Sequence, residues 1–435
     1  MGIYFFLVIT SFWILKPIKK SLFIDYYKTM GGFDLFGWHM LGSQAELLAK
    51  ILNMAAAAVA AIIFTMLCNR FVRQQLAVIF SSFFIICYLL YLTILGNPSG
   101  WGVWSFYLFG DFFNTIMVAT FFAFLNDSVT PDVAKRIYGL AGFGGVAGGA
   151  VGALVVASFV DQISNSRWMI ILSVIAVAII GIALAAGKMA RRTKESQPAD
   201  MPMAEEEQAK APSGRGNPAL EGARLVFRSR YLMAIVGIVG LYEMVSTIMD
   251  FQFTSAVEHF VVESTRQHFS MVFTVTNVFA MIVQLFVTSL VMTRFGVGVA
   301  LLVLPVAALC GSAGFMIFPV LLTGSFLNVA DNSFNYSINQ SARESLYVPT
   351  SRDEKYKAKA FIDMFVQRFA KAVAVGLSLA ITALFTEFNA IRWLSLVSIV
   401  ILIIWIIVAR HAGRKFDEIT RAGTSGIRGG DVREE

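Results

Sequence analysis

The chain has 435 residues, of which 57% are hydrophobic and only 14% charged, whereas an average soluble domain carries roughly 25% charged residues. This composition excludes a soluble globular protein and predicts an integral membrane protein, all-α and built as one bundle of helices. The net charge of +7 is expected to come from basic loops beside the membrane, so it does not indicate nucleic-acid binding.

Twelve apolar segments are long enough for membrane-spanning helices, which need roughly 20 residues each. The first six cover 2–24, 43–68, 75–95, 101–126, 138–160 and 168–188. The second six cover 231–254, 269–293, 297–316, 318–341, 359–385 and 391–410. Two six-helix halves, 1–188 and 231–412, are therefore expected, which is the layout of the major facilitator type.

The stretch 189–230 between the halves is charged and rich in Pro, Gly and Ser, which is typical of a flexible linker. Lys and Arg gather on one side of the predicted spans, in the loops that follow the even-numbered ones: Arg70, Arg73, Lys135, Arg136, Arg191, Arg192, Lys194, Arg294, Arg352, Lys355, Lys357, Arg414 and Lys415. The positive-inside rule then places the linker, both termini and the tail 413–435 in the cytoplasm, as expected for a multi-pass protein of a bacterial inner membrane.

Three lysines follow the charge-free start of the first span: Lys16, Lys19 and Lys20, with Pro17 among them. Their spacing of i, i+3 and i+4 puts them on one helical face. This end of the span faces outward in the predicted topology, where a basic cluster is unexpected. The lysines would either extend from a flank to the interface or line a path for an anion.

Polar side chains also occur inside other predicted spans, where ionisable groups are costly and tend to face a water-filled cavity. Asp111 lies in the middle of the fourth span. The seventh, tenth and eleventh spans carry Glu243, Asp250, Asn328, Asp331, Asn332, Asn335, Asn339, Arg343, Asp363, Gln367, Arg368 and Lys371. The four asparagines recur at spacings of four, three and four, so they form one stripe. Hydrogen bonds between helices are the alternative interpretation of each side chain.

The stretch "GLAGFGGVAGGAVGAL" at 139–154 is rich in glycine, but no Gly-Lys-Ser/Thr follows and no strand precedes it, so it is not a phosphate loop. Gly144, Gly148 and Gly152 recur every four residues, and this pattern predicts close helix packing. The three cysteines are scattered and the four histidines lack ligand spacing, so the sequence predicts no metal, no cofactor and no catalytic residue.

Three stretches, in chain order, resemble the nucleotide translocases, the ATP/ADP exchangers of plastids and intracellular bacteria. "ILKPIKKSLFI" is similar to the first-span motif I-L-R-D-x-K-D-x-L-V-V. "FYLFGDFFNTIMVATFFAFLNDSVTPDVAKRIYGLAGFGG" is similar to the fourth span and the loop after it. "ADNSFNYSINQSARESLYVP" with the later "KAKAFID" is similar to K-Y-S-L-x-x-x-x-K-E-x-x-Y-I-P and G-K-A-x-I-D.

The resemblance implies a secondary transporter, not an enzyme, that exchanges ATP for ADP or imports nucleotides with protons. By position, Lys19 matches the first-span lysine, Asp111 the fourth-span acid and Arg343 the basic residue before the Glu-x-x-Tyr phrase. Lysine and arginine suit phosphate, so the expected substrate-binding residues are Lys16, Lys19, Lys20, Asn332, Asn335, Asn339 and Arg343. The expected coupling or ion-pair residues are Asp111, Glu243, Asp250, Asp331, Asp363, Arg368 and Lys371.

The chain departs from the family pattern at Lys20, where the family has an acid, and in span seven. There Ser246 stands at the family's acid and Asp250 at its lysine, and Glu243 or Asp250 would replace the acid from a nearby turn. A nucleotide or another organic phosphate is the expected partner, beside the lipid bilayer, and the chain could act as a monomer. Two alternatives stay open: a transporter or flippase of another anionic cargo, such as a phosphorylated solute or anionic lipid, and a nucleotide-binding sensor without transport.

Overall fold

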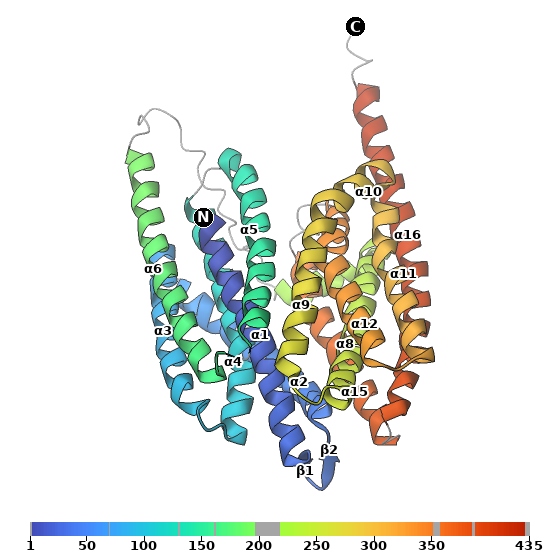
Figure 1. The fold of residues 1–435 in the computed structure, drawn as a ribbon. Helices are drawn as coiled ribbons and strands as arrows, with labels where there is room; N and C mark the ends of the chain where they lie inside the picture. Colours follow the sequence, from blue (N-terminus) through green and yellow to red (C-terminus); the bar gives the residue numbers. More distant parts are fainter. Residues whose placement is uncertain are drawn as a thin grey trace. The chain divides into compact units, whose positions relative to one another are not determined.

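The computed structural model describes residues 2–68, 70–128, 131–160, 162–195, 218–350, 357–384 and 388–430, and nearly all of them are helical (Figure 1). The chain divides into two compact units. Unit 1 comprises residues 1–215 and 263–277, and unit 2 comprises 216–262 and 278–435. The boundary near residue 215 falls inside the predicted linker, whereas the segment 263–277 belongs to unit 1 although it lies in the second half of the sequence.

Unit 1 contains six long helices and a short hairpin in its first 195 residues. The helices are α1 (Gly2–Met30), α2 (Gly42–Cys68), α3 (Arg73–Ile94), α4 (Gly100–Ser128), α5 (Pro131–Ser158) and α6 (Asn165–Glu195). Strands β1 (Phe33–Leu35) and β2 (Trp38–Met40) pair antiparallel between α1 and α2. The sequence did not predict this hairpin because its turn lacks the usual Asn-Gly: Phe36 takes a positive φ of 51° before Gly37 at 83°.

Unit 2 contains the helices of the second half of the sequence, several of them interrupted by π-helical turns. The α-helices are α7 (Pro218–Arg228), α8 (Arg230–Phe260), α9 (Thr265–Ile282), α10 (Ser289–Arg294), α11 (Gly296–Ile317), α12 (Leu321–Phe334), α13 (Gln340–Ser345), α14 (Lys359–Phe361), α15 (Gln367–Leu384) and α16 (Trp393–Gly430). The π-helices are η1 (Val283–Thr288), η2 (Asn335–Asn339) and η4 (Ile362–Val366), and η5 (Phe388–Arg392) is a 3-10 helix. The first part of α9, up to residue 277, belongs to unit 1.

Ten helices of the described ranges are long and apolar enough to cross a membrane. Each coincides with one of the twelve predicted spans. The other two predicted spans are also helical: 142–158 of α5 is a shorter apolar helix, and α12, η2 and α13 follow one another through the predicted span 318–341. The asparagines of that last span lower its mean hydropathy, because amide side chains are strongly polar. The exact number of spans therefore stays a prediction.

Helices α1 and α5 lie side by side in unit 1, and glycines make this contact possible (Figure 1). A Cβ at Gly144 would lie 2.8 Å from the carbonyl oxygen of Gly2, and one at Gly152 would lie 2.6 Å from that of Thr10. Gly148 between them approaches the α1 backbone equally closely. Residue numbers increase along α1 and along α5 in the same direction through these contacts, so the two helices are parallel. The predicted close packing of this segment is confirmed.

Helix α4 packs aromatic rings against α3 and places polar side chains beside α1 and α2. On one side, Phe106, Phe109 and Phe113 pack on rings of α3, such as Tyr88 and Phe84. The other side turns its polar side chains to α1 and α2. Aromatic rings bury large areas and have few rotamers, so this packing fixes the rotation of α4 about its axis.

Helix α7 occupies the end of the stretch predicted as a flexible linker, so that prediction is wrong for residues 218–228. Glu221 forms a 2.9 Å ion pair with Lys357, and a Cβ at Gly222 would lie 2.5 Å from the Lys357 carbonyl oxygen. Pro218 suits the first position of a helix, because its missing N–H has no partner there in any case. The predicted linker residues 196–217 lie outside the described ranges.

Candidate functional site

Lys19 of α1 lies inside unit 1, where only 5% of the residue is exposed. Its Nζ is 2.5 Å from Oδ1 of Asp111 on α4, and the Asn53 amide on α2 donates a hydrogen bond to Oδ2 of the same carboxylate. The lysine stem passes over Gly110, where a Cβ would lie 2.7 Å from Lys19 Cδ. The sequence therefore located both ends of this ion pair but neither Asn53 nor the glycine that leaves room for it.

Lys20 is equally buried, and it pairs with a different helix. Its Nζ lies 3.3 Å from Oε1 of Glu46 on α2, which also accepts a 2.7 Å hydrogen bond from the Tyr107 hydroxyl. The Lys19 ammonium lies 4.6 Å from the centre of the Tyr107 ring, within the range of a cation–π interaction. Tyr107 thus connects the two ion pairs, and extension of these two lysines to the interface is ruled out. We call this set the lysine network: Lys19, Lys20, Glu46, Asn53, Tyr107 and Asp111.

Lys16 has aromatic neighbours. Its Nζ lies 4.2 Å from the centre of the Trp13 ring and 4.7 Å from that of Phe273, which belongs to the part of α9 in unit 1. Aromatic faces attract a cation. All three lysines of this helical face thus lie against aromatic rings, and Lys19 and Lys20 also pair with carboxylates.

In unit 2, polar side chains join α8 to α12. The Ser246 hydroxyl donates a hydrogen bond of 2.6 Å to Oδ2 of Asp331, which is only 3% exposed, and Asn328 donates one of 3.3 Å to Oδ1 of Asp250. By the resemblance given above, Ser246 matches the family's span-seven acid. A carboxylate is therefore present beside that place, but α12 supplies it.

A cation also approaches α8, from α15. Nζ of Lys371 lies 3.7 Å from Oε2 of Glu243 on α8. Residues predicted from three separate spans are thus neighbours in the fold. We call them the carboxylate cluster: Glu243, Ser246, Asp250, Asn328, Asp331 and Lys371.

The asparagine stripe continues along the tenth span as predicted. The Asn332 amide donates to the Asn328 carbonyl oxygen at 3.0 Å, and the Asn339 amide donates to Asn335 Oδ1 at 3.1 Å. Residues 335–339 form the π-helix η2, a feature frequently found at functional sites. Asn339 is 1% exposed, and its Oδ1 has no hydrogen-bond partner among the described residues. This oxygen is a buried acceptor that a donor could still satisfy.

Arg343 follows the stripe on α13 and belongs to a further group of charges. It interacts electrostatically with Asp363, which accepts a 3.3 Å hydrogen bond from Gln367. Beside them, Glu344 and Lys359 form an ion pair of 2.5 Å. Arg368 lies in the first turn of α15.

Three aromatic residues near these groups, Phe106, Tyr107 and Tyr336, differ in their exposure. Phe106 is fully buried against Tyr91 and Phe109, and Tyr107 is part of the lysine network. Tyr336 is 37% exposed on η2. Of the three, only Tyr336 keeps a substantially exposed ring.

Among the described residues, no three His, Cys, Asp or Glu side chains are placed to hold a metal ion. The arrangement provides buried cations beside acids within unit 1, and acids beside amides and one lysine within unit 2. Such charges inside spans are suited to binding and moving a charged solute.

Known proteins share both the sequence pattern and the fold. Residues 97–416, more than half of the chain, match the family described as TLC ATP/ADP transporter. The chloroplastic ADP,ATP carrier protein 1 of Arabidopsis thaliana is 20% identical over 351 residues, which are 73% of this chain and 55% of the carrier. ADP,ATP carrier protein 2 of Chlamydia trachomatis serovar D is 26% identical over 46% of this chain and 41% of its own length. The chain thus spans about half the length of the curated relatives it matches.

Solved structures with the same fold are helical membrane transporters of the major facilitator type. A peptide transporter POT in complex with sulfate has a TM-score of 0.62 at 13% identity, covering 94% of this chain and 95% of its own. The nucleoside transporter NupG has a TM-score of 0.57 at 13% identity, covering 97% and 99%. At such identities the likeness shows the fold alone, whereas the family match over residues 97–416 shows to which family the chain belongs. The chain belongs to the TLC ATP/ADP transporter family.

Proposed function

We propose that the chain is a secondary transporter that carries adenine nucleotides, or organic phosphates close to them, across a membrane by alternating access. The family match supports this proposal. The observation that carries it is the ion pair between the buried Lys19 and the partly exposed Asp111, which the resemblance matches to the family's first-span lysine and fourth-span acid. Ionisable groups inside membrane spans are costly, so such a pair points to function.

The geometry suggests how a phosphate would bind at Lys19. The ammonium would exchange the Asp111 oxygen for a phosphate oxygen, while Asn53 continues to hold the carboxylate. The cation then always has an anionic partner, which avoids the large cost of a bare buried charge. Lys16 and Lys20 would assist, and the proposed contributions of unit 2 are Asn332, Asn335, Asn339 and Arg343.

The acids would couple movement of the cargo to the conformational change. Asp331 is buried and bound to Ser246, so pairing with a cation or a proton would change its interactions substantially. Asp111, Glu243, Asp250, Asp363, Arg368 and Lys371 complete the proposed coupling set. Exchange of ATP for ADP and proton-linked import are two forms of this proposal.

The proposed architecture is twelve spans in two six-helix halves, 1–188 and 231–412, with a cytoplasmic linker at 189–230 and a cytoplasmic tail at 413–435. Helix packing within each unit supports it: α1 packs on α4 and α5, and α8 packs on α12 and α15. Likewise α3 packs on α6, and α11 on α16. Corresponding helices pack on corresponding neighbours, as an internal repeat requires. We propose a monomer in a bacterial inner membrane, with both termini in the cytoplasm.

The test is uptake of labelled ATP into liposomes that contain the purified protein and are loaded with ADP. Liposomes without ADP test exchange, and an imposed proton gradient tests proton-linked import. We expect uptake by the unaltered protein and none by Lys19→Ala, because the phosphate would lose its buried cation. Lys415→Ala, at an exposed lysine of α16, is the matched control and should transport normally.

Absence of ATP uptake under all these conditions, from protein shown to be folded by its melting temperature, would contradict a nucleotide cargo. Normal uptake by Lys19→Ala would remove the proposed role of Lys19. Saturable ATP binding without any uptake would instead indicate a sensor.

A further inference from the structure

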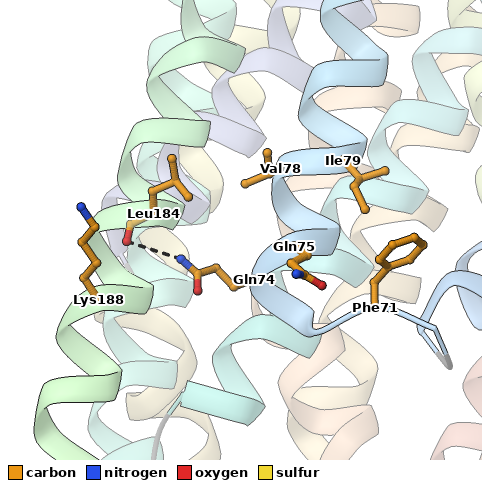
Figure 2. Close-up of a pocket in the computed structure, with 7 residues that line it drawn as sticks. All are labelled: Phe71, Gln74, Gln75, Val78, Ile79, Leu184 and Lys188. Carbon is orange, nitrogen blue, oxygen red and sulfur yellow. Dashed lines mark hydrogen bonds between the residues drawn. The ribbon is translucent and has the colours of Figure 1, made fainter.

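A second site lies between α3 and α6 of unit 1, outside the lysine network. An open pocket of about 550 Å³ is formed there (Figure 2). One side is lined by Phe71, just before α3, and by residues of the first turns of α3, among them Gln74, Gln75 and Val78. Leu184 and Lys188 of α6 line the other side. Its volume is in the range of pockets that bind small molecules, about 300–1,000 Å³.

A glycine of α6 leaves the room that the polar side of the pocket occupies. A Cβ at Gly187 would overlap the side-chain amide of Gln74, so only glycine allows this amide to lie against α6. Gln74 Nε2 donates long hydrogen bonds of 3.4 Å to the carbonyl oxygens of Ala183 and Leu184, and Figure 2 shows the one to Leu184. Hydrogen bonds this long are weak, so a better acceptor in the pocket would compete for the amide.

The polar groups of the pocket are mainly donors. Gln75 uses its side-chain oxygen to accept the Val72 N–H at 3.2 Å, which leaves its NH₂ group to donate. Lys188 is exposed and forms no ion pair with any residue in the described part of the chain. Arg70 and Arg73 lie beside the pocket in sequence and add positive charge. The chemistry that matches these groups is a phosphate.

The rest of the pocket is apolar and lies at one end of two candidate membrane spans. Phe71, Val78 and Leu184 provide its apolar lining. Helix α3 begins at Arg73, and the spanning part of α6 ends at Lys188, so the pocket sits at one end of two spans. Farther along the spans, large apolar side chains remain exposed on both helices: Phe83, Ile86, Leu90, Val174 and Val177. This surface is suited to an acyl chain that continues from the pocket.

We propose that this pocket binds an anionic glycerophospholipid, with the phosphate at Lys188 and the two glutamine amides and the first part of an acyl chain on the apolar lining. A free phosphate would leave the apolar lining uncovered, and the choline of a zwitterionic lipid would meet the positive charge of Lys188. The lipid is a bound partner that holds α3 against α6, and it is distinct from any cargo at the lysine network.

Native mass spectrometry of the purified full chain in detergent tests the proposal, with phosphatidylglycerol and phosphatidylcholine of equal acyl length as probes. We expect one phosphatidylglycerol to be retained by the unaltered protein more tightly than phosphatidylcholine. Lys188→Gln should weaken this retention about fivefold, the effect of one cation near an anionic lipid. Val78→Trp should weaken it also, because the ring fills the pocket without changing the charge.

Lys415→Gln is the matched control, since Lys415 is an exposed lysine on α16 in unit 2 and should leave retention unchanged. Equal retention of the two lipids would overturn the proposal. So would equal loss in Lys188→Gln and Lys415→Gln, which would indicate general attraction to basic residues. Displacement of the lipid by inorganic phosphate at comparable concentration would reassign the pocket to a free anion.

Discussion

The hydroxyl of Ser246 on α8 donates a hydrogen bond of 2.6 Å to the carboxylate of Asp331 on α12. By the resemblance, Ser246 matches an acid of the nucleotide translocases, and in this chain a carboxylate from helix α12 lies beside that position. Glu243 and Asp250, the replacements expected from the sequence, lie on α8 and contact Lys371 and Asn328 instead. The acid bonded to Ser246 therefore comes from α12 and not from α8.

This hydrogen bond predicts that a carboxylate at position 246 can replace the one at position 331. Asp331→Asn should lower the ATP uptake rate about tenfold or more, the effect of losing a charge-assisted hydrogen bond of about 1.5–3 kcal/mol. Adding Ser246→Asp should restore part of the rate, because it returns a carboxylate to the same place. Initial uptake rates in liposomes, normalised to folded protein, measure both effects. A double variant no faster than Asp331→Asn would show that the helix carrying the acid matters.

The pair of Lys20 and Glu46 should control stability, because both side chains are buried. Glu46→Gln would leave the ammonium without its carboxylate and should lower the free energy of unfolding by about 3 kcal/mol. Glu46→Gln combined with Lys20→Met should recover much of this loss, since no charge then remains buried there. Unfolding in detergent measures the difference, and additive losses in the double variant would argue against the pair.

Gly110 should matter for transport, because a Cβ there would lie 2.7 Å from Lys19 Cδ. Gly110→Ala is expected to displace the lysine stem and reduce ATP uptake severalfold while the protein stays folded. Gly181→Ala on α6 is the control, since a Cβ there meets no atom within 4 Å. Uptake and melting temperature should be measured together, and unchanged uptake by Gly110→Ala would show that Lys19 adapts freely.

Gly148 should be needed for the packing of α5 on α1, because a Cβ there would lie 2.5 Å from the Phe6 carbonyl oxygen. Backbone cannot move aside as a side chain can, so Gly148→Ala should cost about 1–3 kcal/mol. Gly142→Ala in the same helix meets nothing within 4 Å and should be neutral or stabilising, since Ala favours helix. Melting temperatures in detergent compare the two, and equal values would contradict the tight contact.

The sequence by itself determined that the long apolar segments are helical and that the glycines of α5 form a close packing face, while the structure identified α1 as the partner. Both depend on local patterns: an apolar run of sufficient length must be helical in a bilayer, and small residues every four positions form one helical face. It also identified Lys19 and Asp111, because single ionisable residues are conspicuous inside apolar runs.

Only the tertiary structure decided which groups these charges contact. Glu46, Asn53 and Tyr107 come from two other helices, and nothing in the local sequence around Lys19 or Lys20 points to them. The same is true of Asp331 beside Ser246, 85 positions away along the chain. The physical reason is that a helix specifies which of its residues share a face, whereas the neighbour of that face is specified by packing with the other helices.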